Sequence, residues 1–207
     1  MARRAELESL NTSDPAFEAI KNTAEQTLRL IDGYLLLAQS EYGQVKLPLE
    51  TVGVGSVIYD AIEEFRPIAA SRKISLVSDI HDVAVETNSK GFRAALWCLL
   101  SLAAESISTD KKAPKRIIVS AKRQNHDHVA VSVLGNLEIS QKEMSLARKL
   151  QGSAHLAAGL HSSGSGVHLA IADIFANLNG DGLHVAKHAN SRGLSLRLLK
   201  SQQLQLI

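Results

Sequence analysis

The segment best suited to chemistry is Ser162–Ala172, which reads SSGSGVHLAIA. Gly164, Ser165 and Gly166 lie directly before an apolar helical run. Glycines at this place expose backbone N–H groups, and the first turn of the following helix adds the positive end of its dipole. The stretch therefore predicts a phosphate-binding loop. A flexible surface loop is the alternative for so short a motif.

Histidines supply the other candidates for binding chemistry. His126 and His128 flank Asp127 between two expected strands, but no third or fourth metal ligand accompanies them, so a solvated turn is the simpler interpretation. His155 and His161 precede the glycine loop, where a phosphate contact and a purely polar loop both stay open. No serine stands in the context of a nucleophile. We therefore predict no catalytic residue and no metal site.

Composition limits the class of protein. The 207 residues have room for one large domain, or for a small module and one further domain. A net charge of +2 with scattered Lys and Arg, and only 4% aromatic residues, disfavours nucleic acid as a partner. Cys98 lies in an apolar run and is expected to be a buried thiol. Without a signal peptide or a long apolar stretch, a soluble, cytoplasmic protein with no membrane span is expected.

The N-terminal part predicts a dimerisation segment over residues 1–46. Residues 1–10 indicate a short helix, and Asp14 with Pro15 can start a second helix over about 15–42. A seam of alternating four- and three-residue steps runs along this second helix: Ile20, Ala24, Thr27, Ile31, Tyr34 and Ala38. Pairing with a second copy into a four-helix bundle would bury that seam. Packing against the rest of the same chain is the alternative.

Residues 47–207 predict an α+β sandwich, with helices on a mixed, largely antiparallel sheet. The expected helices and the expected strands, in chain order, occupy these stretches: an edge strand or linker at 47–52, a helix at 55–71, two short strands at 74–77 and 83–85 joined by a polar turn, a helix at 89–107, a hairpin of 116–121 with 129–133, helices at 140–151 and from the glycine loop to about 178, and a last strand pair at 182–186 and 194–199.

This order of elements resembles a bacterial sensor histidine kinase, with dimerisation helices followed by a GHKL-type ATP-binding domain. Glu25–Gly43 resembles the second dimerisation helix with its glycine exit, and Phe65–Ala69 resembles the first domain helix with its proline. Phe92–Leu100 has the frame of the N-box helix. Gly164–Leu169, followed by Gly180–Gly182, resembles the second glycine box and the turn behind it. The resemblance covers nearly the whole chain, by pattern more than by identity.

The residues that the resemblance would need for kinase chemistry are replaced. The first histidine is His81, so a phosphoacceptor is missing from the first dimerisation helix, which is expected to be truncated. Leu102 aligns with the Asn that holds Mg²⁺ in the family, and leucine cannot ligate a hard cation. Val133–Ile139 lacks the adenine-reading Asp; Asn136 could substitute for it if the register slips by one. His168 replaces the third glycine of the second box.

These departures favour a degenerate histidine-kinase-like protein, a pseudokinase that dimerises and docks a response regulator or another kinase. Nucleotide binding with Mg²⁺ is doubtful in this interpretation; Gly164, Ser165, Gly166 and Asn136 are the residues that would carry it. Two alternatives stay open. One is an ATP-binding fragment of a longer histidine kinase that acts on a histidine of another chain. The other is a phosphotransfer protein derived from a kinase.

Overall fold

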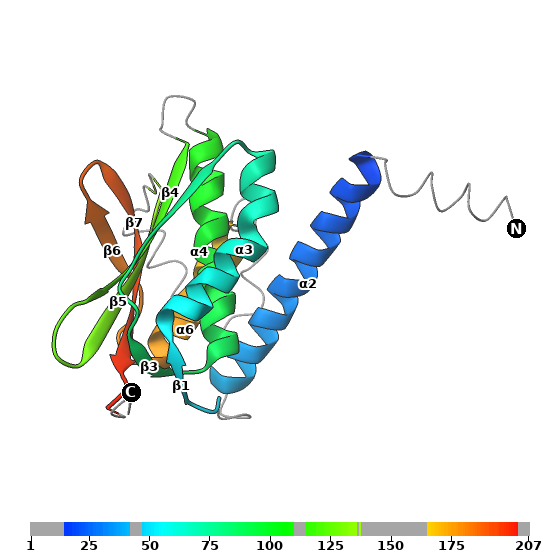
Figure 1. The fold of residues 1–207 in the computed structure, drawn as a ribbon. Coiled ribbons are helices and arrows are strands. Elements are labelled where there is room, and N and C mark those ends of the chain that lie inside the picture. The colour runs from blue at the N-terminus through cyan, green and yellow to red at the C-terminus, as the bar shows by residue number, and fades with distance from the viewer. Residues whose placement is uncertain (1–14, 42–46, 110–114, 136, 138–164, 203–207) are drawn as a thin grey trace, which may run out of the picture.

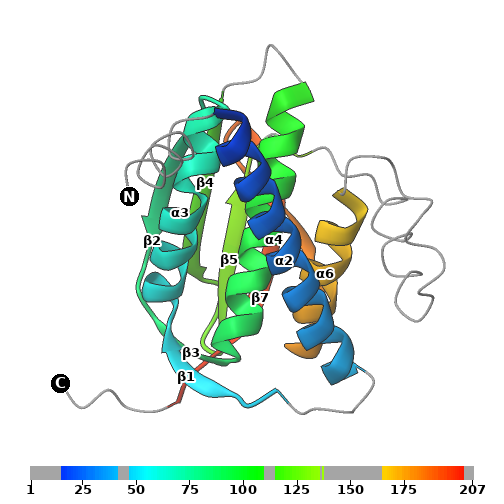
Figure 2. The same cartoon turned by 90° about the vertical axis from the view of Figure 1, so that its right-hand side faces the viewer.

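A computed structural model describes residues 15–41, 47–109, 115–135, 137 and 165–202. The elements within these ranges are, in chain order, α2 (Pro15–Glu41), β1 (Glu50–Gly53), α3 (Val54–Ser71), β2 (Ser75–Ile80), β3 (Ala84–Thr87), α4 (Ser89–Thr109), β4 (Arg116–Arg123), β5 (His128–Leu134), α6 (Ser165–Leu178), β6 (His184–His188) and β7 (Ser191–Lys200). Helices α3, α4 and α6 cover one face of the sheet, and α2 lies outside them (Figure 1, Figure 2). The predicted sandwich of helices on a sheet is confirmed.

The described strands form one seven-stranded sheet in the order β1-β3-β7-β5-β4-β2, with β6 paired to β7. Only β2 and β4 pair in parallel; the other neighbours are antiparallel. The predicted β4–β5 hairpin and the final β6–β7 pair are confirmed. The strands expected at 74–77 and 83–85 both exist, but they do not pair with each other. β2 is the edge strand at one end of the sheet. β3 lies at the other end, beside the edge strand β1.

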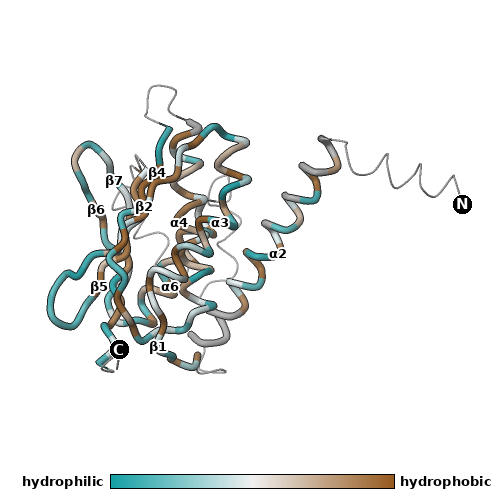
Figure 3. The backbone as a smooth tube through the Cα atoms, viewed as in Figure 1, coloured by the Kyte–Doolittle hydropathy of each residue, from teal (hydrophilic) through white to brown (hydrophobic). Residues whose placement is uncertain are grey.

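The hydrophobic core lies between the sheet and the three covering helices. Alternate residues of β4, β5 and β7 face it, because successive side chains of a strand point to opposite faces. The buried members of these strands include Ile117, Val119, Ala121, Val129, Val131, Val133, Leu194, Leu196 and Leu198. Figure 3 shows many apolar residues along the strands of the sheet and along the helices that cover it. Trp97 and Cys98 belong to this core, as predicted, and burial raises the pKa of the Cys98 thiol well above its usual range.

Helix α4 begins at a cap that the sequence analysis did not single out. The Asn88 side chain accepts a hydrogen bond from Gly91 N at 2.9 Å and donates one to Pro48 O at 3.0 Å. Asn88 is buried, so the hydrogen bond from Gly91 N forms away from water. The cap therefore fixes the start of α4 and ties it to the segment before β1.

The helices expected at 55–71 and 89–107 and the helix after the glycine loop are confirmed as α3, α4 and α6. The short helix expected at 1–10, the helix at 140–151 and the loop up to Gly164 lie outside the described residues. None of the described helices is long and apolar enough to span a membrane.

Asn88→Ala should lower the free energy of unfolding by about 1–2 kcal/mol, because it removes the cap of α4 and the hydrogen bond to Pro48 O. Urea denaturation followed by circular dichroism measures this change. Ser78→Ala, at an exposed position of β2, is the control and should stay within about 0.5 kcal/mol. Equal stability of Asn88→Ala and the unaltered protein would contradict the role given to this cap.

Candidate functional site

The glycine-bearing segment leads into a helix at the predicted place. Helix α6 begins at Ser165, and Gly166 is half-buried in its first turn. Gly164 and Asn136, two of the residues expected to bind nucleotide, lie outside the described residues, as does the side chain of Ser165. Of the four candidates, the structure thus places only Gly166 and the backbone of Ser165. Their backbone position suits an anion, because a helix N-terminus carries partial positive charge.

The first turn of α6 is packed against the side chains of α4. His168 is buried, and its ring centroid lies 5.8 Å from that of Trp97. His168 Nδ1 lies 3.9 Å from Glu105 Oε1. A cavity of about 200 Å³ between α2, α3, α4 and α6 is lined by Phe65 and Arg72 as well as by these three residues. The imidazole at the place of the family's third glycine is therefore part of the packing between α6 and α4, with a carboxylate beside it.

Leu102 lies on the same helix, three residues before Glu105, and its side chain is only 5% exposed. It belongs to the hydrophobic core. The end of β5 packs directly on α4 next to it: a Cβ on Gly135 would lie 2.8 Å from the Ala103 Cβ, closer than two such atoms approach. Gly135 N also donates to Arg192 O at 3.0 Å. The surface of α4 around Leu102 is therefore covered by close packing, and the end of β5 forms part of this cover.

The turn behind α6 is built by glycines and by a buried aspartate. Gly180 and Gly182 have φ values of 106° and 68°, which residues with a Cβ rarely adopt. Asp173 Oδ1 accepts a hydrogen bond from Leu183 N at 3.2 Å, so the carboxylate holds the chain where it leaves the turn. Asp181, within the turn, pairs with Arg197, and the hydrogen bond from that guanidinium holds the pKa of Asp181 below its usual range. The predicted turn is confirmed.

Helix α2 has two faces with different environments. Gly33 is buried, and a Cβ there would lie 3.3 Å from the Ala94 Cβ of α4. Leu30 packs partly on the core, and Arg29 Nη1 lies 3.1 Å from Glu64 Oε2 of α3. The alternative of packing against the same chain therefore holds for this face.

The predicted seam lies on the exposed side of α2, although one of its members, Thr27, also lines the cavity between the helices. Ile20, Ile31 and Tyr34 of the seam are between 40% and 69% exposed, and Ala24 and Thr27 are exposed as well. The side chain of Ala38 lies outside the described part of the chain. Three further apolar side chains of α2 are also exposed: Phe17, Leu28 and Leu35.

Comparison of the sequence with family models and with curated proteins finds no match. Solved structures match well. The Acinetobacter baumannii histidine kinase AdeS aligns with a TM-score of 0.63 at 11% identity, over 97% of this chain and 91% of that one. The mycobacterial sensor histidine kinase MprB aligns with a TM-score of 0.56 at 19% identity, over 73% of this chain and 97% of that one. The fold is that of a histidine kinase catalytic domain.

A third match extends this histidine-kinase-like fold to a longer protein. The structure of full-length ShkA in complex with AMPPNP aligns with a TM-score of 0.63 at 14% identity, over 89% of this chain and 38% of that one. The expected resemblance to histidine kinases is thereby confirmed at the level of the fold. Identities of this size leave the chemistry to be judged from the residues of this chain.

The side chain at the place where the resemblance expects a magnesium ligand does not fit that ion. Mg²⁺ requires oxygen ligands. Leu102 offers no oxygen and is closed off from solvent. His126 and His128 lie at the β4–β5 turn, where Asn125 Oδ1 accepts hydrogen bonds from Asp127 N and His128 N.

The sequence analysis missed an ion-pair network that connects three helices. Glu64 of α3 contacts Arg29 of α2 and, at 3.3 Å, Arg93 of α4. Arg93 also pairs with Asp60 at 2.8 Å. Nothing in the spacing of α3 shows which helices lie against Glu64, so the sequence alone does not predict these ion pairs. The pairs are exposed, so they orient α2 more than they stabilise the fold.

Leu102→Asn should lower the free energy of unfolding by about 2–4 kcal/mol, because it removes a buried apolar side chain and buries an amide in its place. The matched control Leu102→Met keeps the volume and should cost less than about 1.5 kcal/mol. Urea denaturation of both variants tests whether this position is core. An Asn variant as stable as the Met variant would mean that Leu102 borders a hydrated site.

Proposed function

We propose that this chain is a pseudokinase: a histidine-kinase-like module that does not transfer phosphate and acts as a dimeric docking protein in a two-component-type pathway. The observation that supports this most is the burial of Leu102 in the core, at the place where the resemblance expects a magnesium ligand. A side chain that packs in the core has no access to a metal-bound phosphate. The chain has the histidine-kinase-like fold, but the described side chain at this place has no oxygen that could bind a metal.

Electrostatics at α6 supports the same proposal. A helix N-terminus attracts an anion, and here the Glu105 carboxylate lies beside the first turn, next to His168. A nucleotide phosphate at this place would meet a like charge. His168, where the family has a glycine, packs its ring against Trp97 of α4 and so holds the first turn of α6 on that helix.

One observation favours the alternative of an ATP-binding kinase fragment that acts on another chain. Helix α6 starts at Ser165, as a glycine box requires, so its N-terminal N–H groups have the orientation that binds a phosphate. The two hypotheses differ in the affinity for nucleotide. Response regulators or other kinases are the partners that either one implies.

Isothermal titration calorimetry of the purified chain with ATP should show no binding or only millimolar binding, with no increase on adding Mg²⁺. Glu105→Gln removes the carboxylate at α6 and should strengthen ATP binding by less than about tenfold, since the metal ligand is still missing. Gln has nearly the same size as Glu, so the packing is preserved. Micromolar binding that requires Mg²⁺ would overturn the pseudokinase proposal in favour of the kinase fragment.

The exposed stripe of α2 supports dimerisation. Contiguous apolar side chains on a helix surface mark an interaction site in soluble proteins. The heptad steps from Ile20 to Tyr34 are those of a helix that packs lengthwise against another helix. Because α2 uses its Gly33 face for its own domain, a partner helix can cover the seam without displacing α2.

Tyr34→Glu should convert the dimer into a monomer, because it puts a charge into the seam where it would lose its hydration on pairing. Size-exclusion chromatography with light scattering gives the mass directly. The control Glu25→Gln changes one charge at an exposed position of α2 outside the seam and should leave the mass unaltered. A dimer mass for Tyr34→Glu, or a monomer mass for the unaltered chain, would contradict the proposed dimer.

A further inference from the structure

The face of the sheet that points away from the helices carries a groove of about 360 Å³. In Figure 1, β6 lies on this side of the sheet. Strands β2, β4 and β5 contribute one side of the groove, and Ala186, Lys187 and His188 of β6 contribute the other. We call it the sheet groove. Neither the seam of α2 nor the first turn of α6 belongs to it.

The floor of the sheet groove is apolar with hydroxyl groups between. Val77, Ile118, Ala130 and Leu134 provide aliphatic surface there. Ser132 adds a hydroxyl, which donates to Ser195 Oγ at 3.1 Å. Small aliphatic side chains and backbone groups fit such a floor. The described lining contains no Phe, Tyr or Trp on which a nucleobase could stack.

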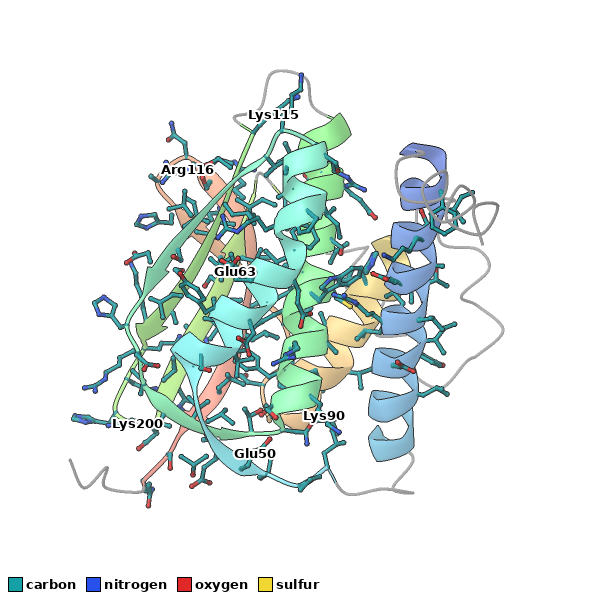
Figure 4. The ribbon with its side chains drawn as sticks, turned by 45° about the vertical axis from the view of Figure 1, so that its right-hand side comes forward. Glu50, Glu63, Lys90, Lys115, Arg116 and Lys200 are labelled. Carbon is teal, nitrogen blue, oxygen red and sulfur yellow. The ribbon has the colours of Figure 1, made fainter. Side chains whose placement is uncertain are left out.

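Cationic side chains surround this floor. Arg116, Arg123 and Lys187 are exposed, and none of the three forms an ion pair with another described residue. Arg116 projects from the sheet on the side away from the helices in Figure 4. Three positive groups without counter-ions on one groove are a local excess, because the whole chain has a net charge of only +2.

The single carboxylate in the described lining does not cancel this excess. Asp79 Oδ2 lies 2.8 Å from Lys122 Nζ. The hydrogen bond from Lys122 holds the pKa of Asp79 below its usual range, and the charges of His81 and His188 act in the same direction. Asp79 is thus neutralised by Lys122, while the remaining three cations stay available to an outside anion.

We propose that the sheet groove binds an acidic, extended segment of a partner protein. Aliphatic side chains of the segment lie on the floor, and its carboxylates pair with Arg116, Arg123 and Lys187. A guanidinium can hold a carboxylate with two parallel hydrogen bonds, which favours Asp or Glu at fixed positions. A second copy of this chain would bring the same positive charge to the interface, so a symmetric dimer is disfavoured here.

Fluorescence anisotropy with the full chain tests this proposal. The probe is a labelled peptide of about eight residues that alternates Glu and Val, with a Lys-Val peptide of equal length and a labelled oligothymidine as comparisons. At about 50 mM salt, where charge attraction is weakly screened, the acidic peptide should bind and the basic peptide should not. Arg116→Glu with Lys187→Glu should weaken binding about tenfold or more.

The matched control is Lys21→Glu with Lys90→Glu, which changes the net charge equally at positions on α2 and α4. It should bind the acidic peptide within about twofold of the unaltered chain. Circular dichroism confirms that both double variants are folded. Equal loss in the two double variants, absence of binding at low salt, or oligothymidine binding that outcompetes the peptide would each overturn the proposal.

Discussion

Close packing around α4 is the constraint on which the rest of the structure depends. The sheet, α3, α6 and α2 all lie against this helix, and the contacts require small partners: Gly33 of α2 meets Ala94, and Gly135 at the end of β5 meets Ala103. Interiors of this density do not accept an unpaired polar group without a cost of several kcal/mol. A leucine at position 102 therefore suits this interior, whereas a polar side chain that could bind a metal would be costly to bury there.

The same constraint bears on the proposed dimer, because it decides which side of α2 stays exposed. A helix that sits on its own domain through Gly33 and Leu30 is oriented along its length, and the Glu64 ion pairs with α2 and α4 fix its angle. The apolar side chains that remain outside are then presented as one stripe. A module with a preset stripe binds a second helix with less loss of conformational freedom than a free helix would.

Much of the fold could be predicted from the sequence because its elements have strong periodicity. The apolar spacing of 89–107 and the alternation in 116–121 and 129–133 predicted α4 and the hairpin in their correct places. Strand pairing between distant segments could not be predicted, because 74–77 and 83–85 have the same pattern and yet lie at opposite ends of the sheet.

The site was predictable only in part. The helix after the glycines was placed correctly, since a glycine loop before an apolar run is a local signal. Glu105 and Glu64 were not assigned a role, because a charged residue on a helix shows its partner only once the neighbouring helices are in position. Gly33 was overlooked for the same reason. A glycine weakens a helix locally, and only the folded structure shows that Gly33 lets α2 lie close to Ala94 of α4.

Denaturant unfolding of the whole chain, with and without Mg²⁺ and ATP, tests the central claim most directly. A ligand that binds the folded state at about one hundred times its Kd adds ~2.7 kcal/mol to the free energy of unfolding. We predict equal midpoints with and without millimolar Mg²⁺ and ATP, because core packing occupies the place of the metal ligand. A shift of the midpoint that requires both Mg²⁺ and ATP would contradict this account.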